Sequence, residues 1–355
     1  MLRREGYLFL ASLVPIFTRC WSDPRIYAAS TLQPRPVIIS TDPGIDDSIA
    51  LLFVAASPEL ELRAVCINFG SLQNTSQLAQ NALAVLALAG KDTVPVYVGA
   101  AEPLAAPFRD LGGALFHGRD GLNGVRLPTP SRGVDTSRTA AEAIVDACRH
   151  WDPKPVILSF APLTNIALAL ALEPQLPALC PDLFLMGGTV TAAGNVSPLA
   201  EANFANDAEA AAKVLRAGFN ARIAGLDVTY ATWLDDAYLE SFRDIPNQAG
   251  PFIWNITRSY VQAYREIGGF DGGMPLHDPS AVLMLLHPTA YSFHRWAADI
   301  DTAAFPSATR GLVIADRRGG PLSPAPPANA TVHFAMTVDV DAVRDLLLRR
   351  IATLP

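Results

Sequence analysis

Short apolar runs alternate with longer segments over most of this chain. The short runs, almost free of polar positions, predict buried strands at 37–40, 62–67, 96–98, 155–159, 183–186 and 222–224. The segments between them predict helices at 47–56, 75–89, 139–151, 165–172 and 207–217. This alternation, with strands that are apolar throughout, predicts an α/β fold in which helices flank a mainly parallel β-sheet.

The pattern is less regular after residue 224. It predicts two helices, two strands and a terminal helix, in this order, at 251–266, 278–286, 311–315, 331–338 and 340–351. Residues 321–328, rich in Pro and Ala, predict an exposed loop, and the glycine-rich residues 112–124 predict a long mobile loop.

Composition limits the classes of protein to which this chain can belong. The chain has 355 residues, 50% of them hydrophobic, which is enough for a single large domain that we place at residues 36–355. A net charge of -7 argues against a nucleic-acid partner, which would need a basic face. Cys66 and Cys148 fall inside a predicted strand and helix, so we expect buried free thiols there.

Residues 1–35 precede the predicted domain and admit two interpretations. Arg3 and Arg4, followed by the apolar residues 7–17, resemble a secretory signal, although Pro15 interrupts the stretch and no cleavage site is convincing. The alternative is an extension outside the fold. The stretch is too short to predict a transmembrane helix, so we expect no membrane partner once any signal segment is removed.

Residues 42–47 (Asp-Pro-Gly-Ile-Asp-Asp) join the first predicted strand to the first predicted helix. Pro and Gly predict a tight turn, and ligands of open α/β sheets bind at such strand ends. Asp42, Asp46 and Asp47 would repel one another unless a cation neutralises them, and carboxylate oxygens suit Ca²⁺ or Mg²⁺. The alternative is that Asp46 and Asp47 only cap the helix.

Other candidates also follow predicted strands or precede helices. Residues 159–165 could turn backbone carbonyls toward the carboxylates, but a plain turn with Thr164 as helix cap is the simpler interpretation. Asp207 and Asp278 precede helices, where an N-cap is the default interpretation. No phosphate-binding loop, dinucleotide-binding glycine motif or serine-hydrolase elbow occurs in the sequence.

The order and spacing of these segments resemble the inosine–uridine-preferring nucleoside hydrolase family from about residue 36 to residue 351. The pieces that carry the resemblance are the turn and five later segments, at 42–47, 162–170, 185–188, 195–203, 277–279 and 310–316. The resemblance implies hydrolysis of the N-glycosidic bond of ribonucleosides to ribose and a free purine or pyrimidine base.

The resemblance also implies one Ca²⁺ at the bottom of a cleft. Its ligands would be the carboxylates of Asp42, Asp47 and Asp278 and the backbone oxygen of Phe160. Two ribose hydroxyls and a water would complete a shell of about six to eight oxygens. Asp42 is similar to the family's general base, which takes a proton from the metal-bound water, while departure of the base leaves an oxocarbenium-like sugar.

On the sugar side, Asp46 would hold the 2′-hydroxyl. Asn195, Glu201 and Asn203 would grip the 5′- and 3′-hydroxyls and stabilise positive charge on the ring, which gives Asn195 a catalytic as well as a binding role.

On the base side, His277 corresponds to a residue that protonates or orients the leaving base, and His117 would lie on a loop that closes over it. The aromatic residues that could contact or stack on the base are Tyr260, Tyr264, Trp233 and Trp254, with helix packing as the alternative for the two tyrosines. Members of the family are commonly dimers or tetramers, so the resemblance implies a homodimer or homotetramer. The resemblance also favours a location in the cytosol over secretion through a signal peptide.

Two positions depart from the family pattern. Ser40 stands where the family usually has an Asp behind the metal ligands, a change that could weaken metal affinity about 10–100-fold. Ser71, a candidate substrate-binding residue, replaces an Asn that helps to order the water or the ribose, and Asn68 and Asn74 lie nearby.

These departures motivate an alternative function, a nucleoside- or ribose-binding protein with weakened or lost catalysis. A third possibility, a metal-dependent phosphohydrolase, is disfavoured because Ser40 occupies the place of its nucleophilic Asp.

Overall fold

The computed structural model describes residues 33–318 and 332–355. The interpretations of residues 1–32 as a signal or extension, and of 321–328 as a loop, lie outside these ranges. Within them, no helix combines the length and the apolar composition that crossing a membrane requires.

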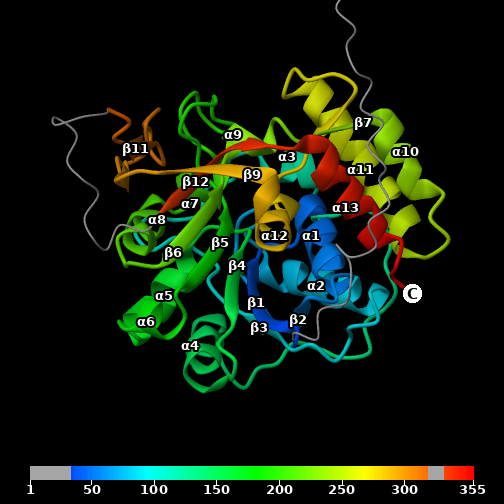
Figure 1. Ribbon diagram of the computed structural model, residues 1–355, viewed down its shortest axis with the longest axis horizontal. Helices are drawn as coiled ribbons and strands as arrows, with labels where there is room; N and C mark the ends of the chain where they lie inside the picture. The colour runs from blue at the N-terminus through cyan, green and yellow to red at the C-terminus, as the bar shows by residue number, and fades with distance from the viewer. Residues whose placement is uncertain (1–32, 319–331) are drawn as a thin grey trace, which may run out of the picture. The chain divides into compact units, whose positions relative to one another are not determined.

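The core of the fold is an eight-stranded sheet (Figure 1). Its strands are β1 (Arg35–Thr41), β2 (Leu60–Ile67), β3 (Val96–Val98), β4 (Val156–Ser159), β5 (Asp182–Met186), β6 (Asn220–Ala224), β9 (Tyr291–Arg295) and β12 (His333–Val338). They lie in the order β3-β2-β1-β4-β5-β6-β12-β9, and only the β12–β9 pair is antiparallel. The predicted α/β fold class is therefore confirmed.

Two antiparallel pairs lie outside this sheet: β7 (Trp233–Asp235) with β8 (Gly273–Pro275), and β10 (Ala298–Ile300) with β11 (Val313–Ala315). The helices are α1 (Ile45–Ala55), α2 (Thr75–Leu88), α3 (Gly113–His117), α4 (Ala140–His150), α5 (Thr164–Leu172), α6 (Leu176–Leu179), α7 (Ala202–Asn206), α8 (Ala208–Leu215), α9 (Leu226–Thr229), α10 (Asp236–Arg243), α11 (Ala249–Glu266), α12 (Pro279–Leu286) and α13 (Val340–Ile351), with a 3₁₀ turn at Pro288–Ala290.

The central strand β1 shows how the sheet divides the core. Successive side chains of a strand point to opposite faces. Val37 and Ile39 pack on one face with α1, α2, α12 and α13, whereas Ile38 packs on the other with α4, α5 and α8. Both faces are covered (Figure 1), which explains why the strand sequences are apolar without alternation.

The structure decides three sequence predictions about local structure. Cys66 and Cys148 are buried free thiols, as expected. Asp207 caps α8, because its Oδ1 accepts the backbone N–H of Ala210 at 3.0 Å. The prediction for Thr164 was wrong: Leu163 is the N-cap of α5, and the Thr164 hydroxyl donates to Asp207 at 2.7 Å.

The glycine-rich segment 112–124 is not a continuous loop. It contains α3, which packs against α11, so the prediction of irregular structure throughout was wrong. The pattern also did not reveal α7, α9 and α10, which are short helices that follow or lie beside turns. Segments this short have too few residues to show a clear helical period.

Candidate active site

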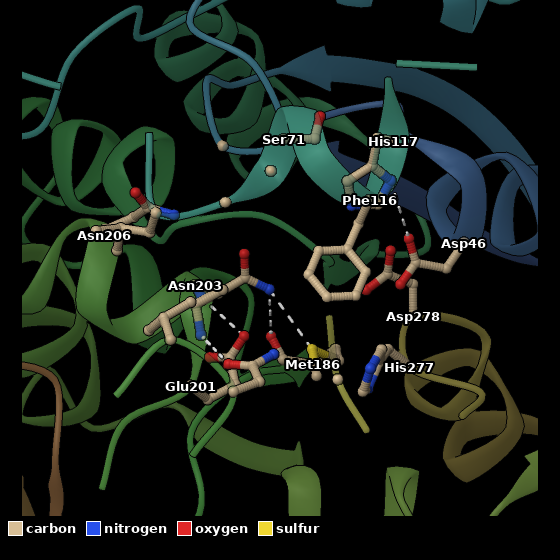
Figure 2. A pocket seen from close by; sticks show the side chains of 18 of the residues that line it. Asp46, Ser71, Phe116, His117, Met186, Glu201, Asn203, Asn206, His277 and Asp278 are labelled. Carbon is tan, nitrogen blue, oxygen red and sulfur yellow. Dashed lines mark hydrogen bonds and ion pairs between the residues drawn. The ribbon is translucent and has the colours of Figure 1, made fainter. Parts of the chain in front are cut away.

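The carboxyl ends of β1, β2, β4 and β5 border a cavity of about 430 Å³ (Figure 2). The residues to which the resemblance gives a catalytic, sugar-binding or metal-binding role all line this cavity: Asp42, Asp46, Asp47, Ser71, His117, Phe160, Asn195, Glu201, Asn203, His277 and Asp278. The parallel sheet brings them together because its strand ends meet at one edge, where ligands of such folds bind.

Four buried carboxylates, Asp42, Asp46, Asp47 and Asp278, form what we call the carboxylate floor. Oxygens of Asp46, Asp47 and Asp278 lie within 4.8 Å of one another, a spacing that could hold a metal ion. This trio differs from the sequence-predicted ligand set in containing Asp46 in place of Asp42.

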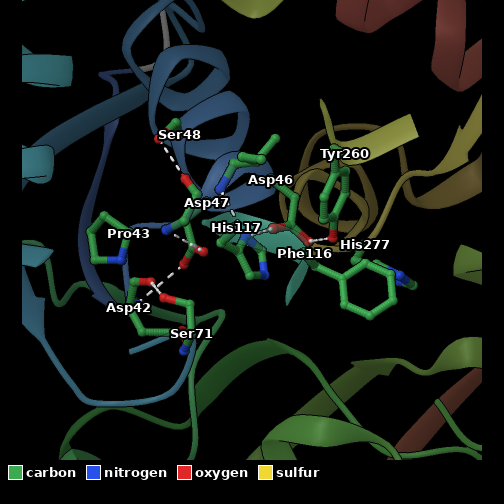
Figure 3. Close-up of polar contacts among 12 residues, drawn as sticks. Asp42, Pro43, Asp46, Asp47, Ser48, Ser71, Phe116, His117, Tyr260 and His277 are labelled. Atoms are coloured by element: carbon green, nitrogen blue, oxygen red, sulfur yellow. Dashed lines mark hydrogen bonds and ion pairs between the residues drawn. The ribbon is translucent and has the colours of Figure 1, made fainter. Parts of the chain in front are cut away.

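Asp42 is held by the segment after β2 (Figure 3). Its Oδ2 accepts the backbone N–H of Ser71, and the Ser71 hydroxyl donates to the Asp42 backbone oxygen at 2.6 Å. A side chain at position 70 would collide with the Asp42 carboxylate, which explains Gly70. The other oxygen, Oδ1, is buried and accepts no hydrogen bond from the described residues.

Asp47 does cap α1, as the alternative interpretation held. It accepts the backbone N–H of Gly44 at 3.0 Å, that of Asp42 at 3.2 Å and the Thr41 hydroxyl at 2.5 Å. Asp46 has fewer donors: the Tyr260 hydroxyl lies 3.4 Å from its Oδ2. Asp278 occupies the N-cap position of α12 without making a side-chain capping bond.

Burial is the main reason why the pKa of each floor carboxylate is raised. The pKa values of Asp46 and Asp47 rise to about 6, and the charge of Asp46 adds to the shift at Asp47. The pKa values of Asp42 and Asp278 are raised well above the ordinary range by burial and by the neighbouring carboxylates. A buried oxygen without a donor among crowded carboxylates fits a hard divalent cation, which would relieve this repulsion.

The cavity also has a polar wall, which is formed by Asn195, Glu201, Asn203 and Asn206. Figure 2 shows Glu201, Asn203 and Asn206 across the cavity from the floor residues Asp46 and Asp278. Glu201 caps α7, and its carboxylate accepts three backbone N–H groups, those of Gly188, Asn203 and Phe204, at 2.7, 2.7 and 3.1 Å. Burial nevertheless raises the pKa of Glu201 to about 7.

Asn203 and Asn195, the two other predicted residues of the polar wall, also make hydrogen bonds within the protein. The Asn203 amide donates to the backbone oxygens of Phe160 at 3.1 Å and Met186 at 3.3 Å, and so joins the ends of β4 and β5. Asn195 Oδ1 accepts the backbone N–H of Ala202 at 2.9 Å.

Asp227 on α9 anchors the loop that leads to Asn195. Its carboxylate accepts the backbone N–H groups of Val190, Thr191 and Ala192 at 2.8, 2.7 and 3.1 Å, and the Thr191 hydroxyl at 2.5 Å. Sequence reasoning missed this residue because its partners lie 35 to 37 positions earlier in the chain.

An aromatic wall, made of Phe116, Tyr230, Tyr260, Tyr264 and Phe270, closes the remaining side. The rings of Tyr260 and Tyr264 are 5.0 Å apart, and Phe116 is 5.0 Å from Tyr264. Both tyrosines therefore face the cavity as well as packing on their helix. Trp233 and Trp254 do not line it.

Two histidines border the aromatic wall. His277 contacts the Tyr264 hydroxyl through Nε2 at 2.7 Å and the Thr229 hydroxyl through Nδ1 at 2.8 Å. His117 Nδ1 accepts the backbone N–H of Ile45 at 3.1 Å. Burial lowers the pKa of His277 to about 3 and that of His117 to about 4, so both rings are neutral near pH 7.

Ser40, which departs from the family pattern, and the two asparagines near Ser71 make hydrogen bonds within the protein. Ser40 is buried behind the floor, 3.4 Å from the Asn165 amide. Asn74 caps α2 by accepting the backbone N–H of Gln77, and the Asn68 amide donates to the Pro162 oxygen. Neither asparagine lines the cavity, so neither takes the place that Ser71 leaves.

A model of the inosine-uridine preferring nucleoside hydrolase family matches residues 37–345. The chain belongs to this family. It is 35% identical over 319 residues to the pyrimidine-specific ribonucleoside hydrolase RihA of a Shewanella species, covering 90% of this chain and 96% of that protein. It is 35% identical over 267 residues to the probable uridine nucleosidase 1 of rice, covering 75% and 81% of the two chains.

Solved structures agree with this assignment. The purine-preferring ribonucleoside hydrolase from Gardnerella vaginalis superimposes with a TM-score of 0.81 at 31% identity, covering 90% of this chain and 98% of that one. The family and these relatives make the protein a hydrolase that acts on N-glycosyl compounds.

Proposed function

We propose that the protein hydrolyses the N-glycosidic bond of ribonucleosides in a Ca²⁺-dependent reaction in which Asp42 is the general base. The observation that carries the proposal is the buried Oδ1 of Asp42, which has no hydrogen-bond donor among the described residues and belongs to a carboxylate floor at the cavity. Such an atom can contact a cation, a water molecule or both.

Asp42, Asp47 and Asp278 would hold the ion with the Phe160 backbone oxygen. Asp46, whose carboxylate lies within 4.8 Å of those of Asp47 and Asp278, would contact a ribose bound beside the ion. When bound, Ca²⁺ would lower the pKa of a coordinated water and orient two ribose hydroxyls. We propose Ca²⁺ over Mg²⁺ because these protein oxygens, two ribose hydroxyls and a water would give the larger oxygen shell that Ca²⁺ takes.

The reacting groups follow from this arrangement. Asp42 takes a proton from the attacking water. Asp46 accepts a hydrogen bond from the 2′-hydroxyl of the ribose. Asn195, Glu201 and Asn203 stabilise the positive charge that develops on the sugar ring as the base departs. The negative and dipolar groups of the floor and the polar wall favour such a cationic sugar.

The base would lie against the aromatic wall, where flat rings stack favourably. The hydrogen-bonded pair of His277 and Tyr264 orients the leaving base or passes it a proton, and His117 closes the same side. Ser71 acts through Asp42, because both of its polar groups are bonded to that residue. Related proteins are named as pyrimidine-specific and as purine-preferring, so the substrate panel covers both base classes.

The test is release of free base from uridine, cytidine, inosine, adenosine and guanosine, measured before and after treatment with a Ca²⁺ chelator. The proposal predicts release that the chelator abolishes and that excess Ca²⁺ restores. A folded protein that binds ribonucleosides without releasing base would contradict it and support the nucleoside-binding alternative. Release that the chelator does not change would contradict the metal-dependent reaction.

A further inference from the structure

The short helix α9 is bonded to two sides of the cavity. Near its start, the backbone N–H of Leu226 donates to the Gly188 oxygen at 3.0 Å, and Asp227 accepts three backbone N–H groups of the loop that follows Gly188. At its end, the Thr229 hydroxyl lies 2.8 Å from Nδ1 of His277. The helix therefore joins the loop that leads to the polar wall with the histidine on the base side.

The contact between Thr229 and His277 joins segments 48 positions apart in the chain. The antiparallel pairing of β7 with β8 brings these segments together. The backbone N–H of Leu276 continues this pairing, because it donates to the Thr232 oxygen at 2.9 Å. The backbone on both sides therefore fixes where the Thr229 hydroxyl meets the ring.

Both ring nitrogens of His277 have partners inside the protein. Nε2 lies 2.7 Å from the Tyr264 hydroxyl, Nδ1 lies 2.8 Å from the Thr229 hydroxyl, and both His277 and Thr229 are buried. A neutral imidazole has one N–H donor and one acceptor nitrogen, and a hydroxyl group can bond to either. A hydroxyl at position 229 therefore satisfies Nδ1 whichever nitrogen carries the hydrogen, and it keeps Nε2 directed at Tyr264.

Thr229 does not line the cavity, whereas His277 and Tyr264 do. The threonine therefore acts on a bound substrate through the histidine. Without its hydroxyl, the buried Nδ1 would lose a hydrogen bond, which is costly enough to favour rotation of the ring. Rotation would in turn separate Nε2 from the Tyr264 hydroxyl.

We propose that Thr229 is a positioning residue that holds the His277 ring against the Tyr264 hydroxyl and so supports departure of the base. The inference rests on the proposed function, in which the pair of His277 and Tyr264 assists the leaving base. As the bond between C1′ and the base nitrogen breaks, its electrons stay on the base, so hydrogen bonding to the base assists departure. A nitrophenolate group leaves as a stable anion and needs no such assistance.

The experiment compares uridine and inosine with p-nitrophenyl β-D-ribofuranoside in wild type, Thr229→Val, Thr229→Ala and Thr229→Ser. Removal of the hydroxyl in the valine and alanine variants should lower kcat for the nucleosides about tenfold, with KM and the rate for the nitrophenyl riboside nearly unchanged. The serine variant, which keeps a hydroxyl, should retain most of kcat. Thr232→Val is the matched control, because Thr232 is also fully buried and its hydroxyl donates to the Val228 backbone oxygen at 3.0 Å.

Three results would overturn the inference. They are unchanged kcat for the nucleosides in Thr229→Val and Thr229→Ala, an equal fall for the nucleosides and the nitrophenyl riboside, and a serine variant as slow as the valine variant. Thermal unfolding of each variant identifies those that fold, and the kinetics are compared among these.

Nuclear magnetic resonance of the ¹⁵N-labelled histidine side chains tests the contact without catalysis. The His277 signals are those that disappear in His277→Gln. We expect Thr229→Val to shift the Nδ1 signal of His277, and Thr229→Ser and Thr232→Val to leave it near its wild-type position. If the wild type releases no base from any nucleoside, the proposed function fails, and an unshifted Nδ1 signal in Thr229→Val would separately refute the positioning role.

Discussion

Two pairs of carboxylates in and beside the cavity, Glu201 with Asp227 and Asp42 with Asp46, have opposite hydrogen-bond environments. Glu201 and Asp227 each accept hydrogen bonds from three backbone N–H groups, and Asp227 accepts one from a hydroxyl group as well. In the floor, Asp47 is likewise supplied with three donors, but Asp42 has an oxygen without a donor among the described residues, and Asp46 has a tyrosine hydroxyl at 3.4 Å. The same functional group therefore serves two purposes: satisfied carboxylates fix the backbone, and carboxylates with free oxygens remain available to a cation and to substrate.

The largest effect predicted by this comparison belongs to Asp42→Asn, which preserves shape and removes the base. We expect base release to fall about 10²–10⁴-fold, the usual contribution of a general base. Steady-state kinetics with the best nucleoside of the panel measure it. A variant with kcat within threefold of wild type would show that another group takes the proton.

Ser40→Asp tests whether the floor lacks a supporting carboxylate. The new side chain would lie beside the Asn165 amide, which is 3.4 Å from the Ser40 hydroxyl and could donate to it. We expect Ca²⁺ affinity to increase about 10–100-fold, the size of effect typical for groups that orient metal ligands. Titration of chelator-treated protein with Ca²⁺ gives the dissociation constant. An affinity equal to or weaker than that of the wild type would mean that Ser40 does not weaken Ca²⁺ binding.

Asp227→Asn tests the satisfied set. An Asn amide group would face at least one of the backbone donors that Asp227 now binds, so the loop leading to Asn195 should loosen. We expect kcat/KM to fall about tenfold while Ca²⁺ affinity stays unchanged. Asp235→Asn, which alters a cap of α10 remote from the floor, is the matched control. Weakened Ca²⁺ binding in Asp227→Asn would contradict the separation of the two sets.

The prediction for Glu201 concerns the pH dependence of stability and not the rate of the reaction. Its pKa is about 7 in the folded protein against an ordinary value of 4.5, so the folded state binds more protons between these values. Its contribution to the free energy of unfolding therefore falls as pH rises from 4.5 to 7, by up to about 1.4 kcal/mol per pH unit. Denaturant unfolding of Glu201→Gln should show a correspondingly weaker decline, and parallel pH profiles would refute this assignment.

The same comparison explains what the sequence could predict. The turn 42–47 is visible because its three carboxylates, its Pro and its Gly are adjacent in the chain, and the apolar runs beside it define β1 and α1. The resemblance to the family supplied the remaining site residues, all of which line the cavity. The fold class followed from strand and helix alternation because parallel strands are buried on both faces.

The residues that were missed depend on contacts between distant segments. Phe116 lies on α3, within a glycine-rich stretch that shows no helical pattern, and meets Tyr264 only through the packing of α3 on α11. Thr164 looked like a cap because its partner Asp207 lies 43 positions later.

The central claim is that the carboxylate floor binds the cation that the reaction needs. Calorimetric titration of chelator-treated protein with Ca²⁺, in wild type and Asp278→Asn, tests it most directly. The account predicts one bound Ca²⁺ per chain in the wild type and loss of that binding in Asp278→Asn, with base release restored only where Ca²⁺ binds. A wild type that binds no Ca²⁺ yet releases base, or an Asp278→Asn variant that binds Ca²⁺ as tightly as wild type, would contradict it.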